Sequence, residues 1–169
     1  KFIEDVRSQT SIPVIASVNC ITPTWWVPYA ADIEAAGAQG IELNISHFPF
    51  MDSELSQAIE SRYADIVGEV TAKVRIPVAV KLGFYFTSLA NTIKNIVDAG
   101  AKAVVLFNRF YTVDVDIDTK CFVPSMTLSS PSEMMTPLRW TGMLAGKIGA
   151  DISASTGIHE AWEKRDGDK

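Results

Sequence analysis

The chain repeats one pattern of segments, and this repeat limits the folds that it can adopt. Ser11–Asn19 reads SIPVIASVN and Arg75–Gly83 reads RIPVAVKLG. Ala36–Asn44 reads AGAQGIELN and Ala99–Asn108 reads AGAKAVVLFN. Each pair combines an Ile-Pro-Val strand start with an Ala-Gly-Ala turn that leads into a second apolar run. The repeat therefore predicts successive units of strand, helix, tight turn and strand.

Short apolar runs alternate along the chain with stretches of helical spacing. The runs are apolar on both faces, as in parallel strands covered by helices. Gly37 and Gly100 stand where a helix ends in a left-handed cap. The predicted strands are Val14–Val18, Gly40–Ile45, Val78–Leu82, Ala103–Phe107 and Asp151–Ser155, and the predicted helices are Trp26–Ala36, Leu55–Lys73, Leu89–Ala99 and Ser132–Lys147.

Strands that alternate with helices predict a parallel sheet with right-handed crossovers. The 169 residues hold about five such units, whereas a complete parallel barrel has eight in about 250 residues. We expect one α/β domain over residues 1–169, an incomplete (β/α)8 TIM-type barrel, either truncated or with segments missing. A further helix is expected to start near His159. An open doubly wound sheet is the structural alternative.

Residues 109–130 break the repeat. Val113, Val115 and Ile117 alternate with aspartates, a pattern typical of a β-ribbon with one exposed face. We expect a β-hairpin or a similar excursion, which in a barrel would lie at the catalytic rim and could serve as a lid.

Charge and composition exclude several classes of protein. A net charge of −5 with a pI near 5.0 argues against a nucleic-acid surface, and no apolar run approaches the length of a membrane helix. Cys20 and Cys121 lie far apart, and the two histidines are too few for a His-rich metal centre. We expect a cytoplasmic protein without a disulfide framework, a metal, or a nucleic-acid or membrane partner.

Polar residues follow the predicted strands, at the ends where β/α barrels carry their function. They are Asn19, Asn44 with Ser46 and His47, Lys81, Asn108 with Arg109, and Thr156 with Gly157.

Lys81 stands out because apolar residues flank it within a strand and burying an ammonium group is costly. It could point outwards at the strand end, lie beside an anionic cofactor, or act as a Schiff-base nucleophile. A single Asn is most often a turn or cap residue, but three at matching strand ends suit the amide edges of a planar heterocycle. Thr156-Gly157 suits either a tight turn or a phosphate site built from backbone N–H groups.

Taken in order, the segments IPVIASVN, ELNIS, IPVAVKLGF, VVLFNRF, TPLRW and SASTGIH resemble the dihydroorotate dehydrogenase family of FMN-containing barrels. The resemblance is closest to its dihydroorotate dehydrogenase-like branch. It implies that Asn19 and Asn44 contact the flavin and that Lys81 lies against the isoalloxazine ring. It also implies that Asn44 and Asn108 bind the substrate. Thr156 and Gly157 would then help to hold the FMN phosphate, where the family has Gly-Gly.

The same resemblance implies a reaction of pyrimidine metabolism, in which a C–C single bond is oxidised and flavin N5 takes the hydride. The family's base, a Cys or Ser, corresponds to His47, and histidine is a competent general base. Phe48, Pro49 and Phe50 depart from the family's Cys/Ser-Pro-Asn. The missing Asn binds orotate in the family, which weakens the case for dihydroorotate as the substrate.

These observations predict an FMN-dependent oxidoreductase acting on a small dihydropyrimidine-like substrate, and the resemblance suggests a homodimer. Two alternatives remain open. The first is a Schiff-base lyase or aldolase barrel with Lys81 as the nucleophile. The second is a flavin-binding protein without catalytic activity.

Overall fold

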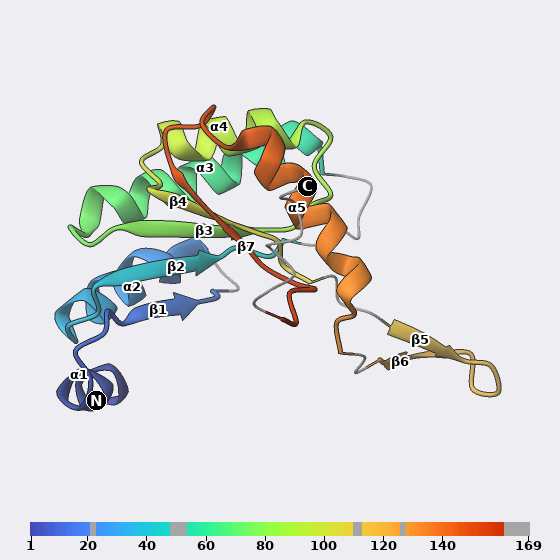
Figure 1. The fold of residues 1–169 in the computed structure, drawn as a ribbon, viewed down its shortest axis with the longest axis horizontal. Coiled ribbons are helices and arrows are strands. Elements are labelled where there is room, and N and C mark those ends of the chain that lie inside the picture. Colours follow the sequence, from blue (N-terminus) through green and yellow to red (C-terminus); the bar gives the residue numbers. More distant parts are fainter. Residues whose placement is uncertain (21–22, 48–53, 110–112, 126–127, 161–169) are drawn as a thin grey trace.

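A parallel five-stranded sheet forms the centre of the chain. The structure, a computed structural model, describes residues 1–20, 23–47, 54–109, 113–125 and 128–160. Figure 1 shows the strands running in one direction, with their carboxyl ends gathered near helix α5. The strands are β1 (Ile15–Val18), β2 (Gly40–Asn44), β3 (Val78–Leu82), β4 (Ala103–Leu106) and β7 (Asp151–Ala154), each within one residue of its predicted bounds.

The strands lie side by side in chain order, β1-β2-β3-β4-β7, and every neighbouring pair is parallel. A doubly wound sheet reverses its strand order at a switch point, and this sheet shows no reversal among its described strands. Each crossover advances in the same direction along the sheet, an order that β/α barrels also have. Among the described residues the sheet does not close, since β1 and β7 form its two edges.

The helices that the repeat predicts are present. They are α2 (Trp26–Ala35), α3 (Ser56–Lys73) and α4 (Leu89–Asp98). Gly37 and Gly100 have φ of 89° and 114°, so the predicted left-handed caps are confirmed. A short 3₁₀ turn, η1 (Pro23–Trp25), leads into α2.

Two helix predictions need correction, and one helix was not predicted. The segment predicted as one helix over Ser132–Lys147 begins as a 3₁₀ turn, η2 (Pro131–Met134), and continues as α5 (Met135–Leu144). It ends early because the chain turns at Gly146, whose φ is 72°. Helix α1 (Phe2–Gln9) was not predicted, since none of its residues is buried. Residues 158–160 are not helical, and the rest of the helix expected near His159 lies outside the described residues.

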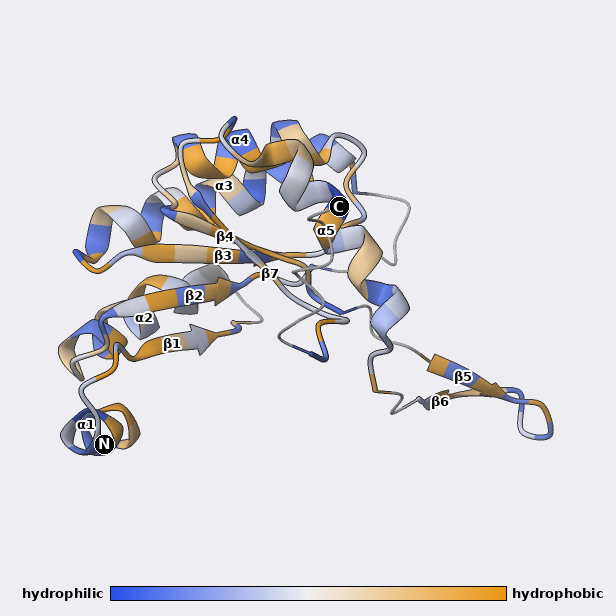
Figure 2. Cartoon of the chain, viewed as in Figure 1, coloured by the Kyte–Doolittle hydropathy of each residue, from blue (hydrophilic) through white to orange (hydrophobic). Residues whose placement is uncertain are grey.

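One face of the sheet carries the hydrophobic core. The strand residues that point to this face are fully buried beneath α3 and α4, and Figure 2 shows β3 and β4 as largely apolar. Strands and helices contribute Ile41, Leu43, Val80, Leu82, Val104, Leu106, Tyr63, Val67, Val70, Ile93 and Ile96.

The opposite face, called the polar face below, carries polar side chains beside apolar ones such as Ala79 and Val105. The expectation of strands apolar on both faces therefore holds fully for one face only. Ser17, Glu42 and Lys81 lie there, and the Ser17 hydroxyl donates to Glu42 Oε1 at 2.6 Å. The physical reason is the common direction of the β-α-β crossovers. Crossovers of one hand along a sheet with no order reversal place every helix on the same side. In the described part of the chain, the other face has no helix over it.

The predicted β-hairpin is confirmed as an antiparallel ribbon of β5 (Val113–Asp116) and β6 (Cys121–Pro124). Val115 lies opposite Phe122, and both are more than half exposed. The ribbon extends away from the sheet in Figure 1. A role as a lid stays a prediction. No described helix is both long and apolar enough to cross a membrane.

Candidate functional site

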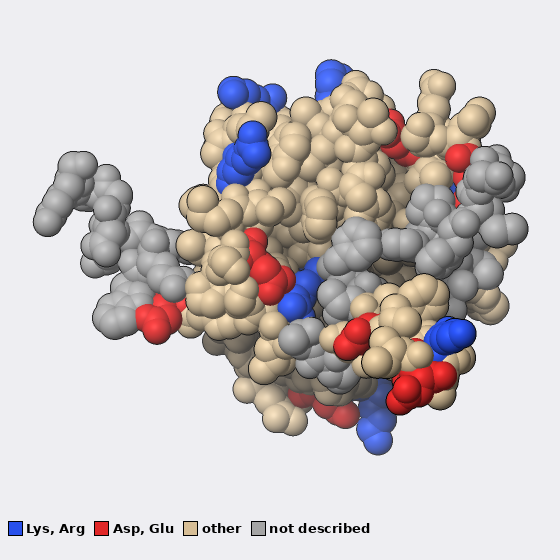
Figure 3. Space-filling view, turned by 90° about the vertical axis from the view of Figure 1, so that its right-hand side faces the viewer, with Lys and Arg blue, Asp and Glu red and all other residues tan. Residues whose placement is uncertain are grey.

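Most of the predicted site residues lie at the carboxyl rim of the sheet. Figure 3 views the molecule from this side, and Lys, Arg, Asp and Glu side chains are scattered over it. In the part of the chain that the figure colours, basic side chains do not gather into one broad patch.

Asn44 and Asn108 come together across the end of β3. Asn44 ends β2, and Asn108 follows β4, where its backbone N–H donates to the Leu82 carbonyl of β3 at 2.6 Å. Asn108 Nδ2 donates to Asn44 Oδ1 at 2.5 Å. Since β3 lies between β2 and β4, this hydrogen bond spans the strand that carries Lys81. Two predicted residues 64 positions apart thus form one unit.

Lys81 stands directly beside Asn44 in the ladder between β2 and β3. Neighbours in register point to the same face of a sheet, so Lys81 projects from the polar face rather than into the core. It is partly exposed and forms no ion pair or hydrogen bond with any residue that the structure describes. Its ammonium group is therefore available to an anionic ligand at the rim.

Asn19 follows β1 and is exposed. It makes no hydrogen bond with another described residue, so the structure brings it to the rim without joining it to the Asn44–Asn108 pair. Cys20 and Cys121 are both free thiols. The described residues contain no group of three or more His, Cys, Asp or Glu side chains that could hold a metal ion.

Thr156 and Gly157 form a sharp turn after β7, with φ of 83° and 78°. A β-branched residue rarely adopts positive φ, so the backbone at Thr156 is strained. This geometry explains why a Gly-Gly pair suits the turn. The backbone N–H groups of both residues donate to no residue in the described part of the chain, although Gly157 itself is buried against η2.

A hollow of about 210 Å³ opens beside this turn, between the ends of β3, β4 and β7 and the start of α5. The rings of Phe84 and Phe107 stand 6.1 Å apart at 74° and form its apolar walls. Its other lining residues are polar or small and include Asn108, Arg109, Glu133, Thr136, Ser155 and Thr156.

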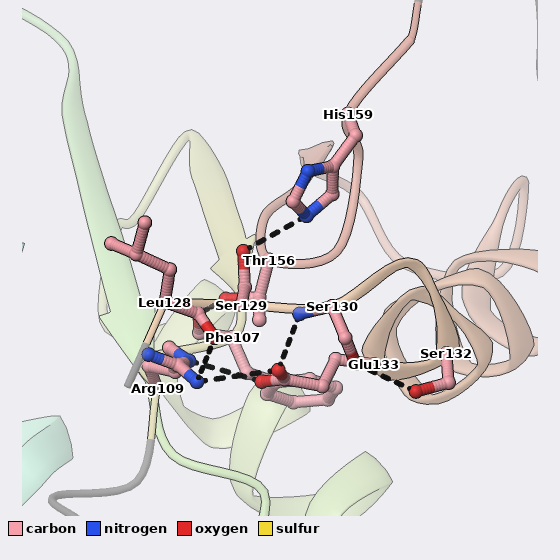
Figure 4. A network of polar contacts seen from close by, with 9 residues as sticks. All are labelled: Phe107, Arg109, Leu128, Ser129, Ser130, Ser132, Glu133, Thr156 and His159. Carbon is pink, nitrogen blue, oxygen red and sulfur yellow. Dashed lines mark hydrogen bonds and ion pairs between the residues drawn. The ribbon is translucent and has the colours of Figure 1, made fainter. Parts of the chain in front are cut away.

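Arg109 and Glu133 form a bidentate ion pair in the wall of this hollow (Figure 4). Arg109 Nε and Nη2 donate to the two carboxylate oxygens at 3.0 and 3.2 Å, and Nη2 also donates to the Leu128 carbonyl at 3.1 Å. Glu133 Oε1 accepts the Ser130 N–H at 2.8 Å as part of a capping box. The hydrogen bonds from Arg109 and Ser130 lower the pKa of Glu133. Sequence reasoning missed Glu133 as a site residue, although Ser-Pro-Ser-Glu marks the helix start.

His47 lies apart from this group. Its Nε2 is 2.7 Å from Glu54 Oε2, and Arg62 donates to Glu54 Oε1 at 2.9 Å. The hydrogen bonds with His47 and Arg62 lower the pKa of Glu54. His47 lines a separate hollow with Tyr85 and Phe86. In the described part of the chain, His47 forms no hydrogen bond or ion pair with Asn44, Lys81 or Asn108.

Tyr63 ties the backbone of His47 to the core, since the His47 N–H donates to its hydroxyl at 3.1 Å. Burial raises the pKa of Tyr63 to about 12, against about 10 in the unfolded chain. The unfolded state then loses its proton first, so the free energy of unfolding should fall between pH 10 and 12, by up to about 1.4 kcal/mol per pH unit. Denaturant unfolding from pH 8 to 12 measures this loss. Tyr63→Phe should flatten that part of the curve, and an unchanged slope would contradict the assignment.

Comparisons with known proteins bear on this site. A protein of Aeropyrum pernix whose name assigns it to dihydroorotate dehydrogenase A (fumarate) is 33% identical over 168 residues, which cover 96% of this chain. Dihydroorotate dehydrogenase B (NAD(+)), catalytic subunit, of Thermoplasma volcanium is 26% identical over 164 residues, or 91% of the chain. The chain spans 54% and 52% of the lengths of these relatives. No family model matches it.

Among solved structures, a phosphonopyruvate hydrolase matches with a TM-score of 0.53 and 19% identity, over 90% of this chain and 57% of that one. At this identity the likeness concerns the α/β fold alone.

Proposed function

From the premise that this chain belongs to a dihydroorotate dehydrogenase-like family, we propose that it is part of an FMN-dependent oxidoreductase that oxidises a CH–CH bond of a dihydropyrimidine-like substrate. Its relatives and its sequence motifs support the oxidoreductase class. The observation that carries the proposal is the Asn44–Asn108 hydrogen bond, which spans the strand bearing Lys81. We further propose that the five-stranded sheet is a segment of a β/α barrel, and that its polar face looks into the barrel.

The residues present fit FMN by their chemistry. Asn44 and Asn108 offer amide groups that match the donor and acceptor edge of the flavin pyrimidine ring. Lys81 offers a cation without a partner among the described residues, and Asn19 adds an exposed amide at the same rim. The N–H groups of Thr156 and Gly157, which have no acceptor among the described residues, suit a phosphate.

FMN, when bound, would supply the two-electron acceptor that takes the substrate hydride. The role of this chain is to hold and orient the reactants and to move a proton. Lys81 would stabilise negative charge that develops beside it during the reaction. Asn44 and Asn108 would bind the substrate through its ring amides. His47 is the proposed base, with Glu54 accepting a hydrogen bond from its Nε2. The proton would then go to Nδ1, which lies 3.5 Å from Arg62 Nη1.

The decisive test is spectroscopic. Purified protein supplied with FMN should show bound, oxidised flavin, and a dihydropyrimidine added without oxygen should bleach it. Failure to bind FMN would contradict both the oxidoreductase and the flavin-binding alternative. Binding without bleaching by any dihydropyrimidine would favour the alternative that lacks catalysis.

Exchange of His47 tests the assignment of the base. His47→Ala should slow flavin reduction by about 10²- to 10⁴-fold, the usual contribution of general-base catalysis, and leave FMN binding intact. Stopped-flow absorbance measures both quantities in one preparation. His159→Ala, at an exposed histidine, is the matched control. A reduction rate unchanged by His47→Ala would show that the ring only joins Glu54 and Arg62 as a structural group.

One observation favours a second candidate. A lysine without an ion-pair partner among the described residues also suits a Schiff-base lyase or aldolase. Borohydride treatment in the presence of a carbonyl substrate, followed by peptide mass analysis, separates the two functions. Covalent labelling of Lys81 would support the lyase and contradict the flavin assignment.

A further inference from the structure

Helix α3 and the segment before it hold His47 at its backbone and at its ring. The His47 backbone N–H donates to the Tyr63 hydroxyl at 3.1 Å. The ring nitrogen Nε2 lies 2.7 Å from Glu54 Oε2, and Arg62 Nη2 donates to the other carboxylate oxygen, Oε1, at 2.9 Å. Glu54 thus binds His47 and Arg62 through different oxygens.

The hydrogen bond to Glu54 fixes which ring nitrogen of His47 carries the hydrogen. The hydrogen bonds with His47 and Arg62 lower the pKa of Glu54, so the carboxylate is ionised near neutral pH and can only accept hydrogen bonds. In a neutral imidazole one nitrogen donates and the other accepts. Nε2 must then carry the hydrogen, and Nδ1 keeps the lone pair that a base needs.

Arg62 leaves this lone pair largely free. Its Nη1 lies 3.5 Å from Nδ1 and 3.4 Å from Nε2. Both distances are long for a hydrogen bond, and one N–H group cannot be in line with both nitrogens, so the contact is weak. The side chains of His47, Glu54 and Arg62 are 30%, 28% and 39% exposed, and solvent therefore screens their charges. The group acts through the direction of its hydrogen bonds rather than through buried charge.

We propose that Glu54 and Arg62 are positioning residues, which hold His47 as the Nε2–H tautomer so that Nδ1 takes the substrate proton. The inference rests on the proposed function and deepens it. In that reaction a C–C single bond of the substrate becomes a double bond. One hydrogen leaves as a hydride to FMN, which gains two electrons, and the other leaves as a proton to Nδ1. Glu54 then stabilises the imidazolium through Nε2–H, and Arg62 holds the carboxylate in place.

The variant Glu54→Gln tests this inference, because Arg62 decides how the new amide is oriented. Arg62 can only donate, so it binds the amide oxygen, and the amide NH₂ group then faces Nε2 of His47. Nε2 becomes an acceptor, and the hydrogen moves to Nδ1. We therefore expect the Nε2–H tautomer in the native chain and the Nδ1–H tautomer in the variant.

Nitrogen-15 NMR distinguishes the two tautomers at about pH 9, where an ordinary histidine is neutral. The chain has only two histidines, and His159→Ala identifies the signals of His47. The measurement needs neither FMN nor substrate. Glu69→Gln, at an exposed position on α3, is the matched control and should leave the tautomer unchanged.

The rate of flavin reduction gives the second readout. Glu54→Gln should slow the bleaching of bound FMN by a dihydropyrimidine by about 10²- to 10⁴-fold, since a ring with its hydrogen on the wrong nitrogen cannot accept the proton. Adding Arg62→Met to this variant removes the donor that orients the amide. The amide can then turn its oxygen towards Nε2, so the Nε2–H tautomer should return, with about tenfold or more of the lost rate.

The outcomes separate this inference from the proposed function. A Glu54→Gln variant that keeps the Nε2–H tautomer or the native rate would overturn the inference and leave the oxidoreductase intact. So would a double variant that is no faster than Glu54→Gln alone, because a merely structural role predicts no rescue. Bleaching by no dihydropyrimidine, with FMN bound to the native protein, would overturn the proposed function and this inference with it.

Discussion

Replacing Lys81 with Met is expected to slow substrate-dependent reduction of bound FMN by about 10²- to 10³-fold, the usual effect of removing one group that stabilises charge in a transition state. Methionine keeps much of the lysine stem, so the variant removes the charge and little of the packing. Lys81 projects from the polar face, and no described residue forms an ion pair with it. The fold should therefore lose little stability. Anaerobic stopped-flow reduction measures the rate, and thermal unfolding measures the stability.

Lys102→Met is the matched control, since Lys102 is an exposed lysine that precedes β4. It should change neither the rate nor the stability. Two results would contradict the assignment of Lys81 to the flavin. One is a rate within a factor of two or so of the native value, far below the loss expected for such a group. The other is a loss of stability large enough to explain the lower rate.

Replacing Gly157 with Ala is expected to destabilise the chain by about 3 kcal/mol or more and to abolish FMN binding. A Cβ atom at this position would lie 2.3 Å from the backbone nitrogen of Met134 and 2.8 Å from the carbonyl carbon of Glu133. Backbone atoms cannot move aside as a flexible side chain can. The φ of 78° adds strain for any residue other than glycine. Overpacking and backbone strain act together here. Denaturant unfolding measures the loss, and FMN titration measures the affinity.

Gly68→Ala is the contrasting exchange, because a Cβ atom at Gly68 would meet nothing within 4 Å. Gly68 lies inside α3, where alanine is the better helix former by about 0.5–1 kcal/mol. This variant should therefore gain stability. A Gly157→Ala variant as stable as the native chain would contradict the close contact between the turn after β7 and the backbone of η2.

The repeated segments made the strands and the three helices α2 to α4 predictable. The apolar runs after Ile-Pro-Val and Ala-Gly-Ala are buried strands, and burial of strands and helices produces a periodic pattern of apolar residues in the sequence. Helix α1 buries no residue, so its sequence shows no such apolar pattern. The location of Asn44, Lys81 and Asn108 at one rim of the sheet was predictable, because all three lie at or just after the ends of parallel strands.

The parts of the site that escaped prediction depend on contacts between loops. Arg109 and Glu133 are 24 residues apart, and their ion pair exists because the ribbon returns the chain to the start of α5. Only tertiary structure brings them together. The position of His47, shortly after β2, was predictable. The direction of its side chain was not, because Glu54 and Arg62 decide it from α3 and the segment before it.

The hydrogen bond between Asn108 and Asn44 fixes what each side chain can still offer. Asn108 Nδ2 donates one hydrogen bond to Asn44 Oδ1. The NH₂ group of Asn44 and the carbonyl oxygen of Asn108 can therefore still bind a ligand. In the described part of the chain, neither of these groups has another partner. The two side chains thus offer donors from Asn44 and an acceptor from Asn108 at the same rim of the sheet. A lactam or an imide carries the complementary edge, and a ring that lacks it would leave one of the two groups unsatisfied.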